Sequence, residues 1–240
     1  MTDRIGEASP SFKARMAGVF QLLEAITAAS PGVFILDKLV VAGNGAATAT
    51  NILGHERLFW VGFASSLIGV AFHIAWALLM YELLEPVNRS LSLLAAFVIL
   101  VGCAIQAFAS LFYLAPLLIL QGGSSLSAFT GEQLQALALM FVKLRAYVFD
   151  IYLVFFGFWC ILIGYLIFRS TFLPRILGVL VAISGLGWVT YLSPTLANHL
   201  WPYIATASAL GEIPLEFWLI VMGCNVQRWK EQASATRMRT

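Results

Sequence analysis

The stretch that decides the fold runs from Ala146 to Phe168 and reads AYVFDIYLVFFGFWCILIGYLIF, 23 residues with Asp150 as their single charged side chain. A hydrocarbon layer about 30 Å thick is crossed by about 20 helical residues, so this segment is long enough and apolar enough to span a membrane. Its apolar run is continuous and shows no period of two, which argues against strands. The segment therefore predicts a transmembrane helix.

The composition extends this prediction to the whole chain. Of 240 residues, 60% are hydrophobic and 11% are charged, and the mean hydropathy is +0.88. A soluble domain is about 45–50% apolar and about 25% charged, and too few charges are present here to cover so apolar a chain in water. These values exclude a soluble enzyme, a disordered chain and a nucleic-acid-binding protein with a basic face. The net charge of +2 indicates no particular partner.

We predict an all-α fold, a polytopic membrane bundle of six transmembrane helices. The predicted spans are Met16–Phe34, Leu58–Leu84, Leu91–Ile119, Ala146–Phe168, Ile176–Leu192 and Trp201–Asn225. They form one transmembrane domain over residues 16–225, between an N-terminal tail (1–15) and a basic C-terminal tail (226–240). Glu24 lies within the first span, and Pro31-Gly32 interrupts it near its end. A cleaved signal peptide is the alternative for this span, but a glutamate is a poor fit to the apolar region of a signal peptide.

The distribution of Lys and Arg predicts the orientation. With the N-terminus in the cytoplasm, ten of the fourteen basic residues fall on the cytoplasmic side. They are Arg4, Lys13, Arg15, Arg89, Arg169, Arg175, Arg228, Lys230, Arg237 and Arg239. By the positive-inside rule we expect both termini to be cytoplasmic and the protein to be a multi-pass protein of the cell inner membrane. The lipid bilayer is its expected partner, and the oligomeric state stays open.

Short-range patterns predict how the longer connections fold. Gly43-Asn44-Gly45 is typical of a turn, and the Ala/Thr run that follows it predicts a short helix at the membrane interface. Thr130 and Gln133 have the spacing of a capping box, which marks the start of a helix. The fourth helix is therefore expected to begin near Glu132, well before its apolar core, and to end at Phe168.

Several segments together resemble one known family. They are Gly43–Ile52, Tyr81–Ser90, Val101–Gln106, Leu126–Phe129, Gln133–Asp150 and Phe156–Gly187. From about Ala14 to Gly223 the chain resembles the bacterial and archaeal membrane proteins of domain-of-unknown-function family 4386. The resemblance implies a small multi-span helical membrane protein and no established activity. This chain reads Gly43-Asn44 where the resemblance implies Gly-Asp in many members, so this chain lacks that acid as a ligand-binding group.

Polar side chains inside spans indicate functional positions, because they are costly in hydrocarbon. Five of them are candidate ligand-binding residues that would form one site if their helices face one another: Glu24, His73, Gln106, Glu212 and Glu216. Glu212 and Glu216 share a helix face, and Pro214 between them frees a backbone carbonyl. This arrangement is typical of cation or proton sites in transporters. The alternative is two acids hydrogen-bonded to neighbouring helices.

A second group of candidates lies where the fourth helix enters the membrane. Lys143, Arg145 and Asp150 form either the rim of an outward-facing pocket or a set of anchors that extend toward lipid headgroups. The three cysteines are expected to be buried and to pack as hydrophobic residues, because none belongs to a CxxC pair. They are Cys103, Cys160 and Cys224.

No catalytic, metal-binding or cofactor motif is present: the chain has no HExxH, GxSxG, P-loop or GxGxxG sequence. We therefore assign no catalytic residue, no metal and no cofactor. Three functions stay open. The first is binding or transport of a small ligand, possibly proton-coupled, through a central polar cavity. The second is an intramembrane enzyme acting on a lipid or isoprenoid, and the third is a non-catalytic membrane partner or assembly protein.

Overall fold

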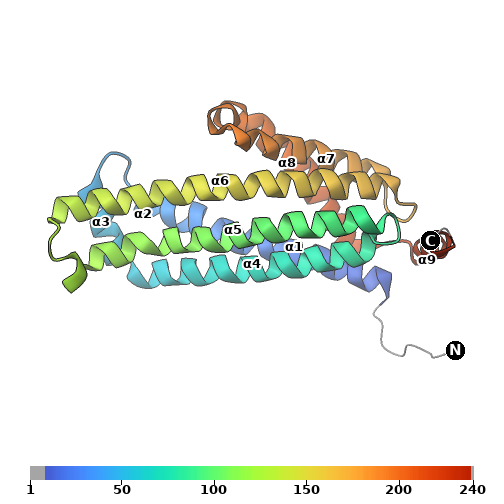
Figure 1. The fold of residues 1–240 in the computed structure, drawn as a ribbon, viewed down its shortest axis with the longest axis horizontal. Coiled ribbons are helices and arrows are strands. Elements are labelled where there is room, and N and C mark those ends of the chain that lie inside the picture. Colours follow the sequence, from blue (N-terminus) through green and yellow to red (C-terminus); the bar gives the residue numbers. More distant parts are fainter. Residues whose placement is uncertain (1–8, 239–240) are drawn as a thin grey trace. The chain divides into compact units, whose positions relative to one another are not determined.

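The fold was analysed in a computed structural model that describes residues 9–238, without the side chains of Ala29, Ser30, Val33, Phe34 and Arg237. The protein is 88% helical, and the described residues contain no strand. Figure 1 labels the α-helices. The helices are α1 (Pro10–Ala29), π-helical η1 (Ser30–Leu36), α2 (Asp37–Leu39), α3 (Gly45–Gly54), α4 (Glu56–Leu84), α5 (Arg89–Gln121), 3-10 helical η2 (Ser124–Leu126), α6 (Gly131–Arg169), α7 (Arg175–Val189), 3-10 helical η3 (Thr190–Leu192), α8 (Pro194–Val221) and α9 (Val226–Arg237). The all-helical prediction is confirmed.

Five helical segments of the described chain are long and apolar enough to cross a membrane. They are Glu56–Leu84, Arg89–Gln121, Gly131–Arg169, Arg175–Leu192 and Pro194–Val221. They correspond to the second to sixth predicted spans. The first predicted span is not among these five. Its residues form α1 and continue into the π-helix η1, which contains Pro31 and Gly32.

Side-chain hydrogen bonds fix several helix ends where the sequence predicted them. The capping box forms at the start of α6: the Thr130 N–H donates to Gln133 Oε1 (2.9 Å), and the Gln133 N–H donates to Thr130 Oγ1 (3.3 Å). The Ala/Thr run is helix α3, and Asn44 Oδ1 accepts from the Ala47 N–H at 2.9 Å. Helix α8 ends at Val221 rather than at Asn225, because Gly223 turns the chain at φ +67°.

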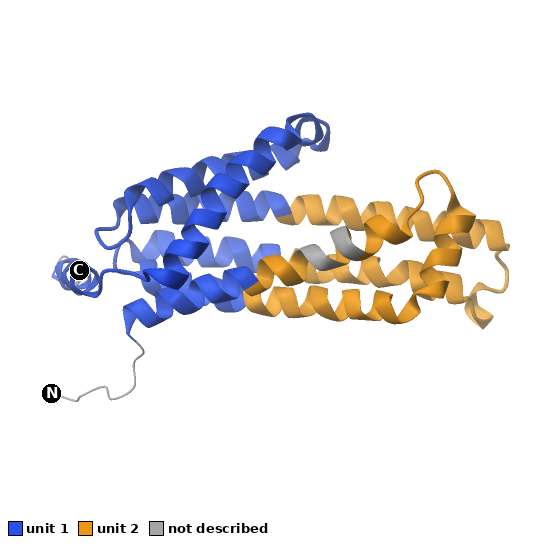
Figure 2. Ribbon diagram, turned by 180° about the vertical axis from the view of Figure 1, so that it is seen from behind, with its two compact units in different colours: residues 1–22, 73–102, 153–240 blue, residues 23–72, 103–152 orange. Residues whose placement is uncertain are grey.

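The chain forms two compact units, coloured separately in Figure 2, and each is described by itself. Unit 1 consists of Met1–Leu22, His73–Gly102 and Leu153–Thr240, and unit 2 consists of Leu23–Phe72 and Cys103–Tyr152. In unit 1, α7 lies beside α8 (Figure 1). Glycines allow close approach between α6 and α7: Gly164 faces the backbone of Gly178, and Gly157 faces that of Gly185. In lipid, apolar side chains gain no free energy by leaving the equally apolar solvent. Helices therefore associate through close packing, which small residues allow.

Unit 2 has its own apolar core around α3, α4 and α5. Its buried members are Ile35, Leu36, Leu39, Ile52, Phe59, Tyr113 and Leu117. The rings of Phe59 and Tyr113 stack at a centroid distance of 4.6 Å. Gly69 of α4 approaches Thr27 and Ala28 of α1, so this glycine is a contact between the two helices.

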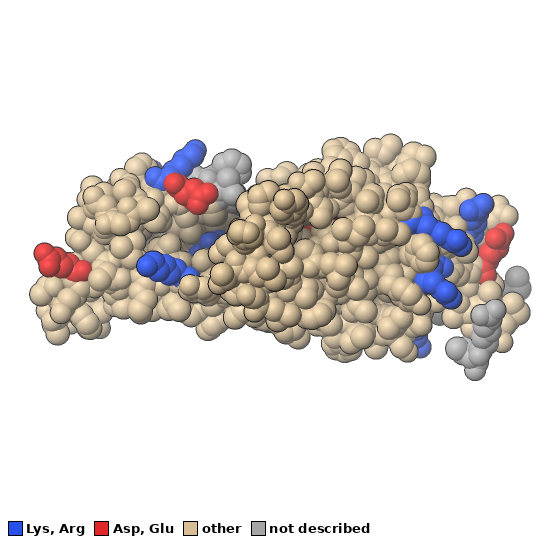
Figure 3. All heavy atoms as spheres, turned by 90° about the horizontal axis from the view of Figure 1, so that it is seen from above, with Lys and Arg blue, Asp and Glu red and all other residues tan. Residues whose placement is uncertain are grey.

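The outer surface of the helices is apolar. On α8, Leu210, Ile213 and Phe217 are each at least half exposed, whereas Leu215 and Leu219 are buried. Figure 3 shows few charged side chains on the face it draws. A surface with large exposed apolar side chains along whole helices fits a hydrocarbon solvent.

Candidate functional site

The eight predicted ligand-binding residues are divided between the two units. Unit 1 holds His73, Glu212 and Glu216, and unit 2 holds Glu24, Gln106, Lys143, Arg145 and Asp150. A single cavity that contains all of them therefore stays a prediction, and the surroundings of each residue are given within its own unit.

Glu212 of α8 is held by three hydrogen bonds to one carboxylate oxygen. Its Oε1 accepts from Ser184 Oγ at 2.5 Å, from Trp188 Nε1 at 2.7 Å and from Ser208 Oγ at 2.9 Å. Ser184 and Trp188 come from α7, and Ser208 precedes Glu212 by one helical turn. These donors compensate a negative charge and tie α8 to α7. This geometry agrees with the hypothesis of an acid hydrogen-bonded to a neighbouring helix.

Glu216 lies one turn further along α8 and is 7% exposed. Its backbone carbonyl lies close to Gly18, so α1 approaches α8 at this level. Gln21 of α1 donates from Nε2 to the backbone carbonyl of Glu212 (3.4 Å), while Gln21 Oε1 is buried without a hydrogen-bond partner among the described residues. The part of α8 that contains Pro214 is therefore covered by α1.

His73 belongs to a buried cluster of aromatic rings. Its ring centroid lies 5.1 Å from that of Trp76, 5.8 Å from Phe156 and 5.7 Å from Trp159. Phe156 also contacts Trp188 at 6.2 Å, the residue that donates to Glu212. The cluster is closely packed and makes an extended aromatic wall in unit 1.

In unit 2, Arg145 lies over two aromatic rings and lines a small cavity. Its guanidinium carbon is 5.6 Å from the ring centroid of Tyr113 and 5.8 Å from that of Phe149. The cavity measures about 10 Å³ and is lined by Ala28, Ser66, Gln106, Ala109, Ser110, Arg145 and Phe149. This volume is about that of one water probe. Arg145 and Gln106 are thus two predicted site residues that the fold brings together.

The polar groups at this cavity are incompletely matched. Gln106 is 5% exposed, and its Oε1 has no hydrogen-bond partner among the described residues. Tyr113 is not part of the lining but stacks with Arg145, and its buried hydroxyl also has no partner in the described part of the chain. Among residues 9–238, no carboxylate forms an ion pair with Arg145, although Asp37 of α2 acts on it electrostatically. A guanidinium has five N–H donors. An aromatic face has no lone pair, so it accepts no conventional hydrogen bond from these donors.

The other candidates of unit 2 lie at different positions. Glu24 of α1 is buried at 8% exposure, Asp150 is half-buried, and Lys143 is exposed. Within the described chain, no group of three or more His, Cys, Asp or Glu side chains could hold a metal ion. All three cysteines are buried, as predicted.

Several neighbours of these sites were not predicted. Ser208 could have been found from its spacing of four to Glu212 on one helix. Ser184, Trp188 and Tyr113 carried no such signal, because they reach the sites from other helices.

The chain is similar to known proteins. Residues 16–223 match the model of the family described as "Domain of unknown function (DUF4386)". The chain belongs to this family. A protein of Archaeoglobus fulgidus described as "Uncharacterized protein" is 26% identical over 148 residues, which cover 61% of this chain and 74% of that protein. No solved structure matches the chain.

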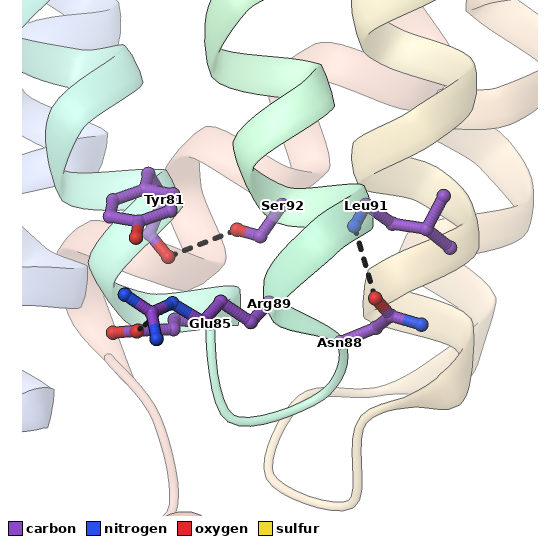
Figure 4. Close-up of polar contacts among 6 residues, drawn as sticks. All are labelled: Tyr81, Glu85, Asn88, Arg89, Leu91 and Ser92. Atoms are coloured by element: carbon purple, nitrogen blue, oxygen red, sulfur yellow. Dashed lines mark hydrogen bonds and ion pairs between the residues drawn. The ribbon is translucent and has the colours of Figure 1, made fainter.

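The family segment Tyr81–Ser90 has a structural role in this DUF4386 member, drawn in Figure 4. Glu85 pairs with Arg89 (3.4 Å), Asn88 Oδ1 accepts from the Leu91 N–H (3.0 Å), and Ser92 donates to the Tyr81 carbonyl (3.1 Å). These contacts close the turn between α4 and α5. Asn44 caps α3, and Asn and Asp are equally good at this position.

Proposed function

We propose that the chain is a six-span protein of the cytoplasmic membrane that binds a small, negatively charged ligand beside Arg145. The observation that carries the proposal is the guanidinium of Arg145, which stacks on two rings, forms no ion pair with any described residue and lines a cavity together with Gln106. Arg145 is half-buried, and among the described residues only Asp37 acts on it as a counter-charge, without forming an ion pair. Cation–π contacts contribute only about 0.5–2 kcal/mol each. An anion would accept the donors that the rings leave unmatched.

The depth of the cavity supports access from the outer face. Gln106 lies 17 residues after Arg89 on α5, about 26 Å along the helix, and Arg145 lies 24 residues before Arg169 on α6, about 36 Å. If Arg89 and Arg169 mark the cytoplasmic interface, as the distribution of basic residues predicts, then the cavity is about one hydrocarbon thickness away. A ligand from the outer aqueous phase would reach it without crossing the hydrocarbon.

The sixth span in this proposal is α1 together with η1 and α2. These elements follow one another from Pro10 to Leu39 without a break, about 45 Å at the α-helical rise. An even number of spans puts both termini on the cytoplasmic side, in agreement with the ten-to-four division of basic residues. A reporter fused after Thr240 that is active only in the cytoplasm would support this topology, and one active only outside it would refute it.

The ligand is tested by thermal unfolding of the purified chain in detergent. The test probe is chloride, because the cavity of about 10 Å³ has room for about one water-sized group. Formate, phosphate and a bulky organic anion, titrated at the same constant ionic strength, are the larger anions for comparison. A ligand at one hundred times its Kd stabilises the folded protein by about 2.7 kcal/mol, so at least one probe should raise the melting temperature of the wild type in a saturable way.

The variants decide whether the effect arises at Arg145. Arg145→Gln should abolish the shift, and Gln106→Leu should weaken it. Lys143→Gln is the matched control, because it removes the same charge two residues away from an exposed position. Equal responses from Arg145→Gln, Lys143→Gln and the wild type would mean a general salt effect and would refute the proposal.

A further inference from the structure

A second polar cavity lies at the end of unit 1 where α1 begins and α4 ends, against α9. It measures about 310 Å³ and is lined by Ser9, Pro10, Lys13, Glu82, Leu83, Val226, Trp229 and Lys230. This volume is at the lower end of the range of small-molecule sites. The cavity shares no lining residue with the cavity of Arg145.

We infer that this cavity binds the phosphodiester headgroup of an anionic phospholipid. Two lysines from different helices contribute to it. Lys13 Nζ pairs with Glu82 Oε2 at 2.7 Å, and Lys230 forms no ion pair with any residue of the described chain. One carboxylate against two ammonium groups leaves a net positive charge at the cavity, which favours an anion.

The start of α1 adds to this positive potential. Ser9 caps the helix by accepting the Phe12 N–H on its Oγ at 3.2 Å. The N-terminal end of a helix as long as α1 has a partial positive charge of roughly half a unit. Lys13, Lys230 and this helix end therefore all contribute positive electrostatic potential to the cavity.

Hydrogen bonds attach α9, which carries the second lysine, to two turns of unit 1. Trp229 Nε1 donates to the Leu83 carbonyl at 2.9 Å, and Thr236 Oγ1 donates to the Pro86 carbonyl at 2.8 Å. Gln232 Oε1 accepts from both the N–H and the hydroxyl of Thr171 at 3.0 Å. Helix α9 is therefore docked on the α4–α5 and α6–α7 turns and holds Lys230 beside the start of α1.

The apolar part of the lining points to a lipid rather than to a free anion. Pro10, Leu83 and Val226 lie beside the lysines, and Trp229 supplies an aromatic ring of the kind enriched at membrane interfaces. A phosphodiester with an attached glycerol and acyl chains has both an anionic and an apolar part. Free inorganic phosphate has only the first.

The test uses the full chain, delipidated in a neutral detergent, with phosphatidylglycerol and phosphatidylcholine of identical acyl chains as probes. Melting temperature and native mass spectrometry report stabilisation and retained lipid. We expect phosphatidylglycerol to bind at least tenfold more tightly than phosphatidylcholine. Glycerol 3-phosphate and inorganic phosphate form a third arm, and neither should displace the lipid at millimolar concentration.

Variants assign the binding to this cavity. Lys230→Gln should weaken phosphatidylglycerol binding about tenfold, as expected for one charge-assisted contact. The double variant Lys13→Gln/Glu82→Gln leaves the net charge of the cavity unchanged and should weaken binding through the loss of the Lys13 ammonium. Arg169→Gln is the control, since Arg169 is exposed and is not part of the lining; its effect should stay below twofold.

Three outcomes would overturn the inference. Equal losses for Lys230→Gln and Arg169→Gln would mean diffuse attraction of anionic lipid. No preference for phosphatidylglycerol would exclude a headgroup site. Saturable stabilisation by glycerol 3-phosphate without any by phosphatidylglycerol would mean a soluble phosphate ligand.

Discussion

Replacement of Gly164 by alanine should separate α6 from α7 in unit 1. A Cβ atom at Gly164 would lie 2.6 Å from the carbonyl oxygen of Gly178 and 2.8 Å from the backbone nitrogen of Ala182. Ordinary contact begins at 3.4 Å, so the helices would have to move apart by about 0.8 Å. Both contacts are with backbone, so no side-chain rotation can relieve them.

The expected loss of stability follows from two opposing terms. Overpacking costs about 1–3 kcal/mol, and a backbone clash belongs in the upper part of that range. Alanine recovers about 1 kcal/mol through its higher helix propensity. The net destabilisation should be about 1–2 kcal/mol, which corresponds to a decrease in melting temperature of about 3–6 °C for a chain of this size.

Gly187→Ala provides the matched control on α7. A Cβ atom there would meet Ile204 at 3.4–3.6 Å, which is ordinary contact. This variant should be neutral or more stable by up to about 1 kcal/mol. Thermal unfolding of both variants in one detergent, followed by tryptophan fluorescence, measures the difference. If Gly164→Ala is as stable as Gly187→Ala, then the close approach of α6 and α7 does not exist and the reasoning is wrong.

Two further predictions concern hydrogen bonds. Trp188→Phe removes the 2.7 Å donor to Glu212 and should lower the free energy of unfolding by about 1–2 kcal/mol, since hydrogen bonds to charged groups contribute about 1.5–3 kcal/mol and two donors remain. Trp201→Phe, which removes no hydrogen bond to Glu212, should have a much smaller effect in the same thermal melt, and equal effects would refute this role of Trp188. Asn44→Ala should destabilise α3 by about 1 kcal/mol, whereas Asn44→Asp should not. Amide hydrogen exchange over Gly45–Gly54 measures both, and unchanged protection in Asn44→Ala would contradict the capping role.

The sequence predicted the features that depend on local interactions. The start of α6 followed from Thr130 and Gln133, because a capping box involves only residues three apart. The helix after Gly43-Asn44-Gly45 followed from turn chemistry in the same way. The end of α8 was placed four residues too late, because Met222–Asn225 continues the apolar pattern while Gly223 reverses the backbone.

The candidate site could be predicted only in part. The cost of a polar side chain inside a span indicated Gln106, and the position at the membrane entry of the fourth helix indicated Arg145. Both residues line one cavity. The sequence contained no sign that Tyr113 and Phe149 would stack on Arg145. The C-terminal residues were expected to form a basic tail, and their docking as α9 on two turns depends on Trp229 and Thr236 contacting backbone carbonyls about 150 residues away.

The sequence by itself determined that this protein is a set of long apolar helices and where most of them begin. Hydropathy and capping act within one segment, so each helix can be predicted without its neighbours. Only the tertiary structure decided that Gly164 meets Gly178 and that Ser184 and Trp188 reach Glu212. Those contacts depend on the rotation of each helix about its axis. In a membrane, lipid and core are equally apolar, so hydrophobicity does not fix that rotation, and close packing and hydrogen bonding do.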